Sequence, residues 1–306
     1  MDLQRCLRVG QMIAVVIFVA GCSSMSKSAR RQFTLVSVGP EGSGVRMFRS
    51  AHHLVYTTFY DDRRLSAAID TLEASYDACI ELTGFRPPAG ENEQIAFLFA
   101  KRAEWEAFTR SRAGAAAPLY LRLDRGGYTL GKACVVRDQG EHDTLTVLAH
   151  EQLHVFIATH FRARPPPFLE EGLASLLERV KHDDGRIRID VGNSTSRAVR
   201  LATVIDAGQL VPLRQLLSMH AGNVVGLSGQ EVDAFYSQAW AFARFLRDGE
   251  GGRYRPALMR LLNDAATGAL SSASLADNPS LIERYLGESL ENLQPAYPRF
   301  AAKVAQ

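Results

Sequence analysis

The sequence predicts an α+β fold in which a mixed region of strands and helices is followed by a mainly helical portion. The first half of the chain alternates short apolar runs, typical of strands, with segments of helical periodicity. From Thr144 onward most periodic segments are helical. With 306 residues, 46% hydrophobic and 22% charged, the chain has the composition of a folded protein, not of a disordered, collagen-like or coiled-coil one.

The mixed region is expected to span residues 33–180. Alternating or continuous apolar runs predict strands at residues 33–38, 52–59, 94–100, 119–123 and 132–137, the last two separated by a turn at 124–127. A long amphipathic segment at 61–83 predicts a helix that ends at Gly84, and 101–110 predicts a shorter one. Trp105 and Phe108 of the shorter helix are expected to pack in the core.

Residues 181–306 are expected to form a helical portion that shares one core and one cleft with the mixed region. A strand or hairpin arm at 186–191 and a glycine-rich loop at 222–229 are the exceptions. Apolar periodicity predicts helices that include residues 233–247, 254–262 and 281–303.

The charge of the chain gives no sign of a nucleic-acid partner. The 35 Lys and Arg residues are nearly balanced by 33 Asp and Glu, which leaves a formal net charge of +2. A nucleic-acid-binding domain is expected to gather basic residues on one face, and these charges are interspersed. We therefore expect no nucleic-acid partner.

Residues 1–21 are typical of an export signal. Basic residues precede a short apolar run at 12–20, and small residues follow it. The segment Val19-Ala20-Gly21-Cys22 resembles the bacterial lipobox, whose cysteine becomes the lipidated first residue of the mature chain. This resemblance implies lipidation at Cys22, a linker at 22–32, and, because Ser23 follows, an outer-membrane lipoprotein facing the periplasm. An ordinary signal peptide or an uncleaved anchor would also export the chain.

Two cysteines, Cys79 and Cys134, remain in the expected folded region. An oxidising compartment permits a disulfide between them, and two buried free thiols are equally consistent with the sequence. Neither belongs to a CxxC pair of the redox or zinc-binding kind.

The segment His150-Glu151-Gln152-Leu153-His154 carries the strongest functional signal. A helix turns about 100° per residue, so His150 and His154 share one face and can bind the same ion. Glu151 lies beside that face, where its carboxylate can reach a water molecule on the ion. Asp143-Thr144 is the expected N-cap of this helix. Because HExxH arises by chance in roughly one chain per hundred, a third ligand is needed to support the interpretation.

Glu171 is the predicted third ligand. The proline-rich stretch at 162–167 ends the first helix, and a second helix is expected from Phe168 to about Val180. An antiparallel return through this loop would bring Glu171 to the ion. Gly172 is small, which lets the second helix approach the first closely, although glycine within a helix costs about 1 kcal/mol. The alternative is an exposed acidic helix start.

These two segments together resemble the gluzincin metallopeptidases, whose signature is HExxH followed by a W-L-x-E-G-x-A helix. In this chain the second motif reads F-L-E-E-G-L-A, with Phe168 in place of the frequent Trp. The resemblance implies a zincin-like catalytic region, built from a small mixed sheet and active-site helices, and a Zn²⁺ ion bound by His150, His154 and Glu171 rather than Glu170. The short interval and the lipoprotein signal are most similar to bacterial peptidase-MA-like proteins.

A later segment extends this resemblance. Tyr236-Ser-Gln-Ala-Trp-Ala-Phe242 is similar to a Y-x-Q-A-W-x-F segment of such proteins. By analogy with related aminopeptidases, Tyr236 is the candidate for stabilising the oxyanion, and packing against Trp240 in a helix interface is the alternative. No G-x-M-E-N-type exopeptidase segment precedes the zinc helix, so a requirement for a free substrate N-terminus is not expected.

The implied reaction is hydrolysis of a peptide bond. Three protein ligands leave zinc a fourth position for water, whose proton Glu151 can accept and pass to the leaving amine. The strand at 132–137 is the candidate edge strand for an extended peptide substrate. We therefore expect an exported zinc metallopeptidase acting on peptide or protein substrates in the cell envelope. The alternatives are a non-catalytic scaffold or binding lipoprotein that keeps a metal for stability, and an amidase acting on cell-wall peptide.

The other histidines give weaker signals. His52 and His53 alternate on a strand, so at most one is expected to face a site, and His160 lies off the ligand face of its helix. Surface or capping positions are expected for His142, His182 and His220. Asp143 or Glu178 is a candidate partner that orients a ligand imidazole.

Overall fold

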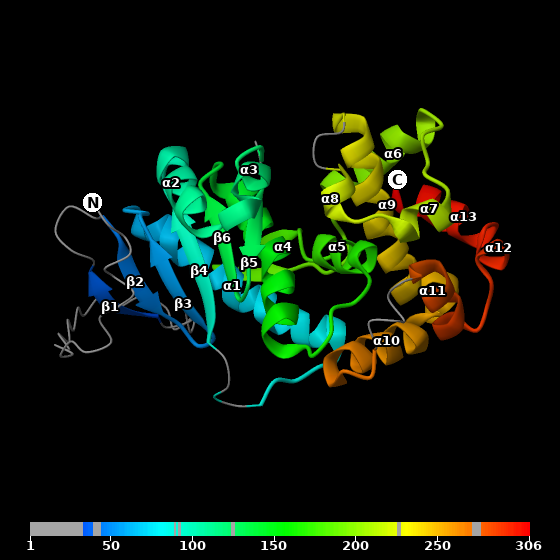
Figure 1. The fold of residues 1–306 in the computed structure, drawn as a ribbon, viewed down its shortest axis with the longest axis horizontal. Coiled ribbons are helices and arrows are strands. Elements are labelled where there is room, and N and C mark those ends of the chain that lie inside the picture. The colour runs from blue at the N-terminus through cyan, green and yellow to red at the C-terminus, as the bar shows by residue number, and fades with distance from the viewer. Residues whose placement is uncertain are drawn as a thin grey trace.

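The computed structural model describes residues 33–38, 44–88, 90, 93–123, 126–224, 228–270 and 277–306. The predicted export signal, the lipidation site Cys22 and the linker lie outside the described residues. The expected α+β fold is confirmed: Figure 1 shows a mixed sheet formed by the N-terminal part of the chain and helices over the C-terminal part. Among the described residues, no helix combines the length and apolar character needed to cross a membrane.

Six strands form the main sheet, in the order β1-β2-β3-β4-β6-β5. Strands β3, β4 and β6 are parallel, and the other neighbours pair antiparallel. The strands are β1 (Thr34–Val38), β2 (Arg46–Arg49), β3 (His53–Thr57), β4 (Gln94–Phe99), β5 (Gly127–Leu130) and β6 (Ala133–Arg137).

Helices cover both faces of this sheet. The long helices α1 (Asp62–Thr83) and α4 (Glu141–His160) pack on one face, where Val55, Cys134 and Val136 meet Leu72 and Leu148. Helix α2 (Arg102–Arg112), followed by a short 3₁₀ turn and α3 (Ala117–Tyr120), covers the other face. There the predicted core residues Trp105 and Phe108 are buried with Phe99, Tyr128 and Val135. The alternation of Cys134, Val135 and Val136 between the two faces follows the two-residue period of a strand.

The C-terminal portion is mainly helical, as predicted, and it shares a core with the first. Its helices pack on α1 and α4 through a cluster that contains Tyr76, Phe156, Phe168, Trp240 and Phe242. The elements are α5 (Pro167–Ser175), a hairpin of β7 (Val180–Asp183) and β8 (Arg186–Ile189), α6 (Thr195–Asp206), α7 (Leu213–Ser218), α8 (Ala221–Val224), α9 (Gly229–Asp248), α10 (Arg255–Thr267), α11 (Asn278–Leu286), α12 (Leu290–Leu293) and α13 (Ala296–Val304).

Several local predictions are wrong. Residues 119–123 do not form a strand: α3 ends there in a turn, because Leu121 N–H bonds back to the carbonyl of Ala117 and the ring of Tyr120 stacks on Tyr128. The strand β5 begins inside the stretch predicted as a turn, of which Asp124 and Arg125 lie outside the described residues. The pairing of β5 outside β6 also makes β5, not the strand at 132–137, the edge of the sheet.

Helix ends account for the other differences. The predicted helix at 281–303 is three helices, because Gly287 ends α11 in a left-handed conformation and Ser289 caps α12. Helix α5 ends at Ser175 rather than near Val180, where the chain already enters β7. The predicted loop at 222–229 contains most of α8 and the start of α9, and its residues 225–227 lie outside the described residues.

Candidate metal centre

Two histidines and one glutamate come together where α4 meets α5. The Nε2 atoms of His150 and His154 lie 3.3 Å apart. The Oε2 atom of Glu171 lies 3.4 Å from His150 Nε2 and 3.6 Å from His154 Nε2. These three residues form a group able to hold a metal ion. Figure 1 shows α4 and α5 between the sheet and the C-terminal helices.

The spacing of these three atoms fits one specific coordination geometry. Zinc binds histidine nitrogen and carboxylate oxygen at roughly 2.0–2.2 Å with tetrahedral angles, which sets neighbouring ligand atoms roughly 3.3–3.6 Å apart. The three separations of 3.3, 3.4 and 3.6 Å fall within this range. The chain thus holds three donors in position for a single small ion.

The connection between the two helices fixes this arrangement. Pro167 opens α5, and the N–H groups of Leu169 and Glu170 bond to the carbonyl of Pro166. The loop before these prolines is held by α10, because Ala163 N–H bonds to the carbonyl of Ala265. The return from α4 to α5 is therefore tied down on both sides.

Gly172 approaches a different helix from the one that the sequence suggested. A Cβ at this position would lie 2.3 Å from the carbonyl oxygen of Ala239 and 2.9 Å from the Cβ of Ala243, both in α9. The expectation that Gly172 serves the contact between α5 and α4 is wrong, because α9 is the helix packed against it. The close packing of α5 on α9 also brings Tyr236 into the neighbourhood of the ligands.

Each ligand imidazole has its own carboxylate partner. His150 Nδ1 lies 3.0 Å from Glu178 Oε1, so Glu178 is the predicted partner that orients this imidazole. The other predicted partner, Asp143, is exposed. His154 Nδ1 lies 2.8 Å from Oε1 of Glu170, the residue before the third ligand. A carboxylate at Nδ1 holds the proton there and leaves the Nε2 lone pair for a metal.

Two arginines neutralise these partner carboxylates. Arg197 donates from Nε and Nη2 to the two oxygens of Glu178 at 2.8 and 2.6 Å. Arg164 forms a similar two-point pair with Glu170, from Nε to Oε2 at 3.0 Å and from Nη2 to Oε1. Sequence reasoning did not identify Glu170, Arg164 or Arg197 as partners. Only the adjacency of Glu170 to a ligand offered a signal.

The charges of this cluster match a divalent cation. Four carboxylates, those of Glu151, Glu170, Glu171 and Glu178, face two guanidinium groups, which leaves a formal charge of −2 with neutral imidazoles. Adding one divalent ion brings the sum to zero. Low-polarity surroundings penalise unbalanced charge, so the residues present fit such an ion.

The pKa shifts of the ligands reflect the same imbalance. Burial favours the neutral form of His150, but its bonds to Glu171 and Glu178 outweigh burial and raise its pKa to about 9. Burial also opposes the charged form of His154, yet Glu171 and Glu170 raise its pKa well above the ordinary value. Burial would raise the pKa of Glu171, but the charge of His154 and the bonds from both imidazoles hold it well below the usual range. Protonated imidazoles therefore supply positive charge to the metal-free cluster.

Glu151 lies next to the ligands but bonds elsewhere. Its Oε2 accepts a hydrogen bond of 2.9 Å from the hydroxyl of Thr129, on the edge strand β5. The side chain is buried, and its residue is 7% exposed. The expected general base is thus tethered to the sheet edge rather than drawn into the ligand set.

Tyr236 faces the ligand cluster from α9. The centroids of its ring and the His150 ring are 6.4 Å apart, and the guanidinium carbon of Arg197 lies 5.0 Å from the Tyr236 ring centre. Burial, followed by the charge of Glu171, raises the pKa of the phenol, so it stays protonated at neutral pH. Trp240, one turn later, is fully buried in the main core.

The start of α4 differs from the prediction. The helix begins at Glu141 after Gly140, whose φ is +93°, so Asp143 and Thr144 lie inside the first turn and do not form its N-cap. The hydroxyl of Thr144 instead accepts a hydrogen bond of 3.0 Å from the N–H of Gln139. The HExxH segment lies two to three turns further along a regular helix.

The opposite face of α4 carries a buried polar chain that sequence reasoning missed. His52 and His53 both bond to the carboxylate of Glu73, at 2.7 and 2.8 Å, so the expectation that strand alternation would separate them is wrong. His52 precedes β3 and is free of that alternation. The Nε2 of His53 contacts Oε1 of Gln152, Gln152 donates to Oε1 of Gln94, and the Gln94 amide nitrogen contacts Nε2 of His160.

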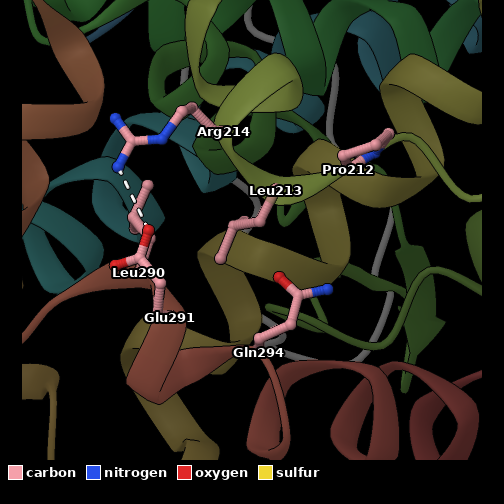
Figure 2. A pocket seen from close by; sticks show the side chains of 6 residues that line it. All are labelled: Pro212, Leu213, Arg214, Leu290, Glu291 and Gln294. Atoms are coloured by element: carbon pink, nitrogen blue, oxygen red, sulfur yellow. Dashed lines mark ion pairs between the residues drawn. The ribbon is translucent and has the colours of Figure 1, made fainter.

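Three remaining features lie apart from the ligands. Cys79 and Cys134 are buried free thiols in separate core clusters, so they form no disulfide. His142, His182 and His220 are exposed, as expected. A cavity of about 260 Å³ has no candidate site residue in its lining. Figure 2 shows the side chains that line it, those of Pro212, Leu213, Arg214, Leu290, Glu291 and Gln294.

Comparison with known proteins adds no family assignment. No protein-family model matches the chain, and no curated protein sequence matches it significantly.

Proposed function

We propose that this protein is a zinc-dependent metallopeptidase whose metal ligands are His150, His154 and Glu171. The observation that carries the proposal is the triangle of donor atoms, with sides of 3.3, 3.4 and 3.6 Å. Two nitrogens and one oxygen at these separations suit tetrahedral zinc. With neutral imidazoles, the four carboxylates and two arginines leave a formal charge of −2, which a divalent ion would balance.

Three protein ligands are typical of a catalytic zinc site, because structural sites use four. Zinc bound there would polarise the substrate carbonyl and lower the pKa of a water molecule toward about 7. Glu151 is the group placed to accept a proton, since it lies next to His150 in the helix without joining the ligand triangle.

The protein side chains then carry the proton and the developing charge. A carboxylate oxygen of Glu151 accepts the proton of the attacking water and afterwards gives it to the leaving amine nitrogen. Thr129 holds Oε2 of this carboxylate at 2.9 Å, which orients the group during both transfers. The protonated hydroxyl of Tyr236 can donate a hydrogen bond to the carbonyl oxygen as negative charge develops on it.

A peptide is the substrate class that this site suits best. The strand β5 is the edge of the sheet, and its residue Thr129 touches the proposed base. An extended peptide that pairs with the outer edge of β5 would pass beside Glu151. The role predicted for the strand at 132–137 thus moves to its outer neighbour, β5.

The place of action is a further part of the proposal. Lipidation at Cys22 would anchor the enzyme in the cell envelope, where it would meet peptide or protein substrates. Membrane fractionation of the wild type and the Cys22→Ser variant tests this, because only the wild type should remain with the membrane.

The test of the proposed reaction is the Glu151→Gln variant. We expect it to keep one zinc per chain and lose peptide cleavage by at least 100-fold, since only the proton acceptor is removed. A zinc-loaded wild type that cleaves neither denatured proteins nor diverse peptides would refute a peptidase. Cleavage of peptidoglycan fragments alone would identify an amidase, and no cleavage of either would leave the scaffold alternative.

A further inference from the structure

Arg197 is the side chain that touches both a ligand's partner and the proposed oxyanion donor. It lies in the first turn of α6, with 17% of its side chain exposed. Its guanidinium donates two hydrogen bonds to Glu178, which also contacts His150 Nδ1 and the hydroxyl of Ser194. Its carbon also lies 5.0 Å from the centre of the Tyr236 ring.

The start of α6 is fixed in a way that makes this contact well defined. Ser194 caps the helix by accepting from the N–H of Arg197 at 3.4 Å. The preceding loop is tied to α5, because Gly192 N–H bonds to the carbonyl of Leu176 at 2.7 Å. The backbone that carries Arg197 is therefore anchored to the helix that carries the third ligand.

The second arginine of the site offers a natural comparison. Arg164 pairs with Glu170 as Arg197 pairs with Glu178, and Glu170 bonds the other ligand imidazole. However, Arg164 has 54% of its side chain exposed, and among the described residues it is Arg197 that lies over the Tyr236 ring. Both arginines thus pair with the carboxylate partner of a ligand imidazole, but only Arg197 also contacts the Tyr236 ring.

We propose that Arg197 is a positioning residue that couples two parts of the reaction centre, by holding His150 through Glu178 and the ring of Tyr236 through a cation–π contact. This inference rests on the proposed function, because it assigns Tyr236 its part in the reaction. A planar, two-pronged guanidinium can satisfy both oxygens of Glu178 while its face lies on the tyrosine ring. A lysine ammonium can supply charge but neither the fork nor the flat face.

Removing Arg197 has two separable consequences. Glu178 loses its cation and two hydrogen bonds, so His150 is held less firmly and zinc binds less tightly. Tyr236 loses the face against which its ring is ordered, so its hydroxyl no longer reaches the developing charge in a fixed geometry. The first consequence is shared with Arg164, and the second belongs to Arg197 alone.

The test is a pair of double-mutant cycles with the full chain. Arg197→Gln and Arg164→Gln are each combined with Tyr236→Phe, and zinc affinity is measured by competition with a chromophoric chelator, beside kcat and KM for a peptide. We expect both arginine variants to lower zinc affinity by about 10–100-fold. At saturating zinc, Tyr236→Phe should lower kcat about 100-fold in the wild type and in Arg164→Gln, but less than tenfold in Arg197→Gln.

Two outcomes of these cycles would overturn the inference. One is an equal effect of Tyr236→Phe in both arginine backgrounds, and the other is an unchanged zinc affinity in Arg197→Gln. Arg197→Lys is the control for misfolding, because it keeps a cation beside Glu178. We expect this variant to have a near-normal melting temperature, a lowered kcat and a little-changed KM. Unchanged kcat in this variant would also contradict the coupling.

Failure of the proposed function gives a different result. A wild type that binds zinc and cleaves nothing refutes the peptidase and with it the Tyr236 part of this inference. The zinc affinities of the two arginine variants then decide the His150 part without any measurement of activity.

Discussion

Replacing Gly172 by alanine should weaken zinc binding without altering a ligand. The added Cβ would lie 2.3 Å from the carbonyl oxygen of Ala239. This neighbour is backbone and cannot rotate away, so α5 must move off α9. Glu171 directly precedes Gly172 in α5, and it moves with the helix.

The magnitude follows from the contact distance. Ordinary van der Waals contact begins at 3.4 Å, so α5 must shift by about 1 Å. Metal–ligand distances tolerate only about 0.2 Å. We expect zinc affinity to fall about 10–100-fold, as when an orienting partner of a ligand is lost. Overpacking of this kind typically lowers the free energy of unfolding by about 1–3 kcal/mol. The better helix propensity of alanine offsets about 1 kcal/mol of this loss.

The assay is chelator competition for zinc affinity, beside thermal unfolding of the metal-free protein. Gly229→Ala is the matched control, because Gly229 begins α9 and a Cβ there meets no atom within 4 Å. The control should change stability by less than about 0.5 kcal/mol and leave zinc affinity unchanged. If Gly172→Ala bound zinc as tightly as the control, the contact between α5 and α9 would not be what positions Glu171.

Two further predictions concern protons. At pH 7, zinc binding should release about two protons, because His150, with a pKa of about 9, and His154, whose pKa is also raised, must lose their Nε2 protons. Calorimetry in buffers of different ionisation enthalpy measures the number of protons released. The affinity for zinc should rise with pH up to about 9. A release of no protons would contradict the charge argument. Burial, aided by Lys132 and His52, lowers the pKa of His160 to about 4, below its ordinary 6.5. The unfolded chain therefore binds this proton first, and stability present above pH 6.5 should fall by about 1–3 kcal/mol as the pH drops to 4. His160→Gln, which can still accept from Gln94, should remove this part of the decline in urea titrations, and an identical pH profile would count against it.

The sequence allowed the fold class and the ligand triangle to be predicted because both depend on local spacing. Apolar periodicity places α1 and α4 to within a few residues. The four-residue interval of His150 and His154 sets their common face, and the proline-rich break before Phe168 indicates a return of the chain. These features require no knowledge of distant contacts.

The features that were missed depend on contacts between distant segments. The edge position of β5 follows from strand order, which short runs around Gly127 do not reveal. The need for glycine at position 172 comes from the carbonyl oxygen of Ala239, a residue 67 positions later in the chain. Arg197 in α6 reaches Glu178, which follows α5, only because the chain folds back through the β7–β8 hairpin. Such tertiary pairings leave no periodic trace in the sequence.

The most direct test of the metal centre compares two adjacent glutamates. Zinc per chain is measured by elemental analysis in the purified wild type, Glu171→Gln and Glu170→Gln, after dialysis against a weak chelator. We expect one zinc in the wild type, almost none in Glu171→Gln, and retention in Glu170→Gln, whose amide oxygen can still accept from His154. Equal zinc content in the wild type and Glu171→Gln, or no zinc in the wild type after loading, would contradict this expectation.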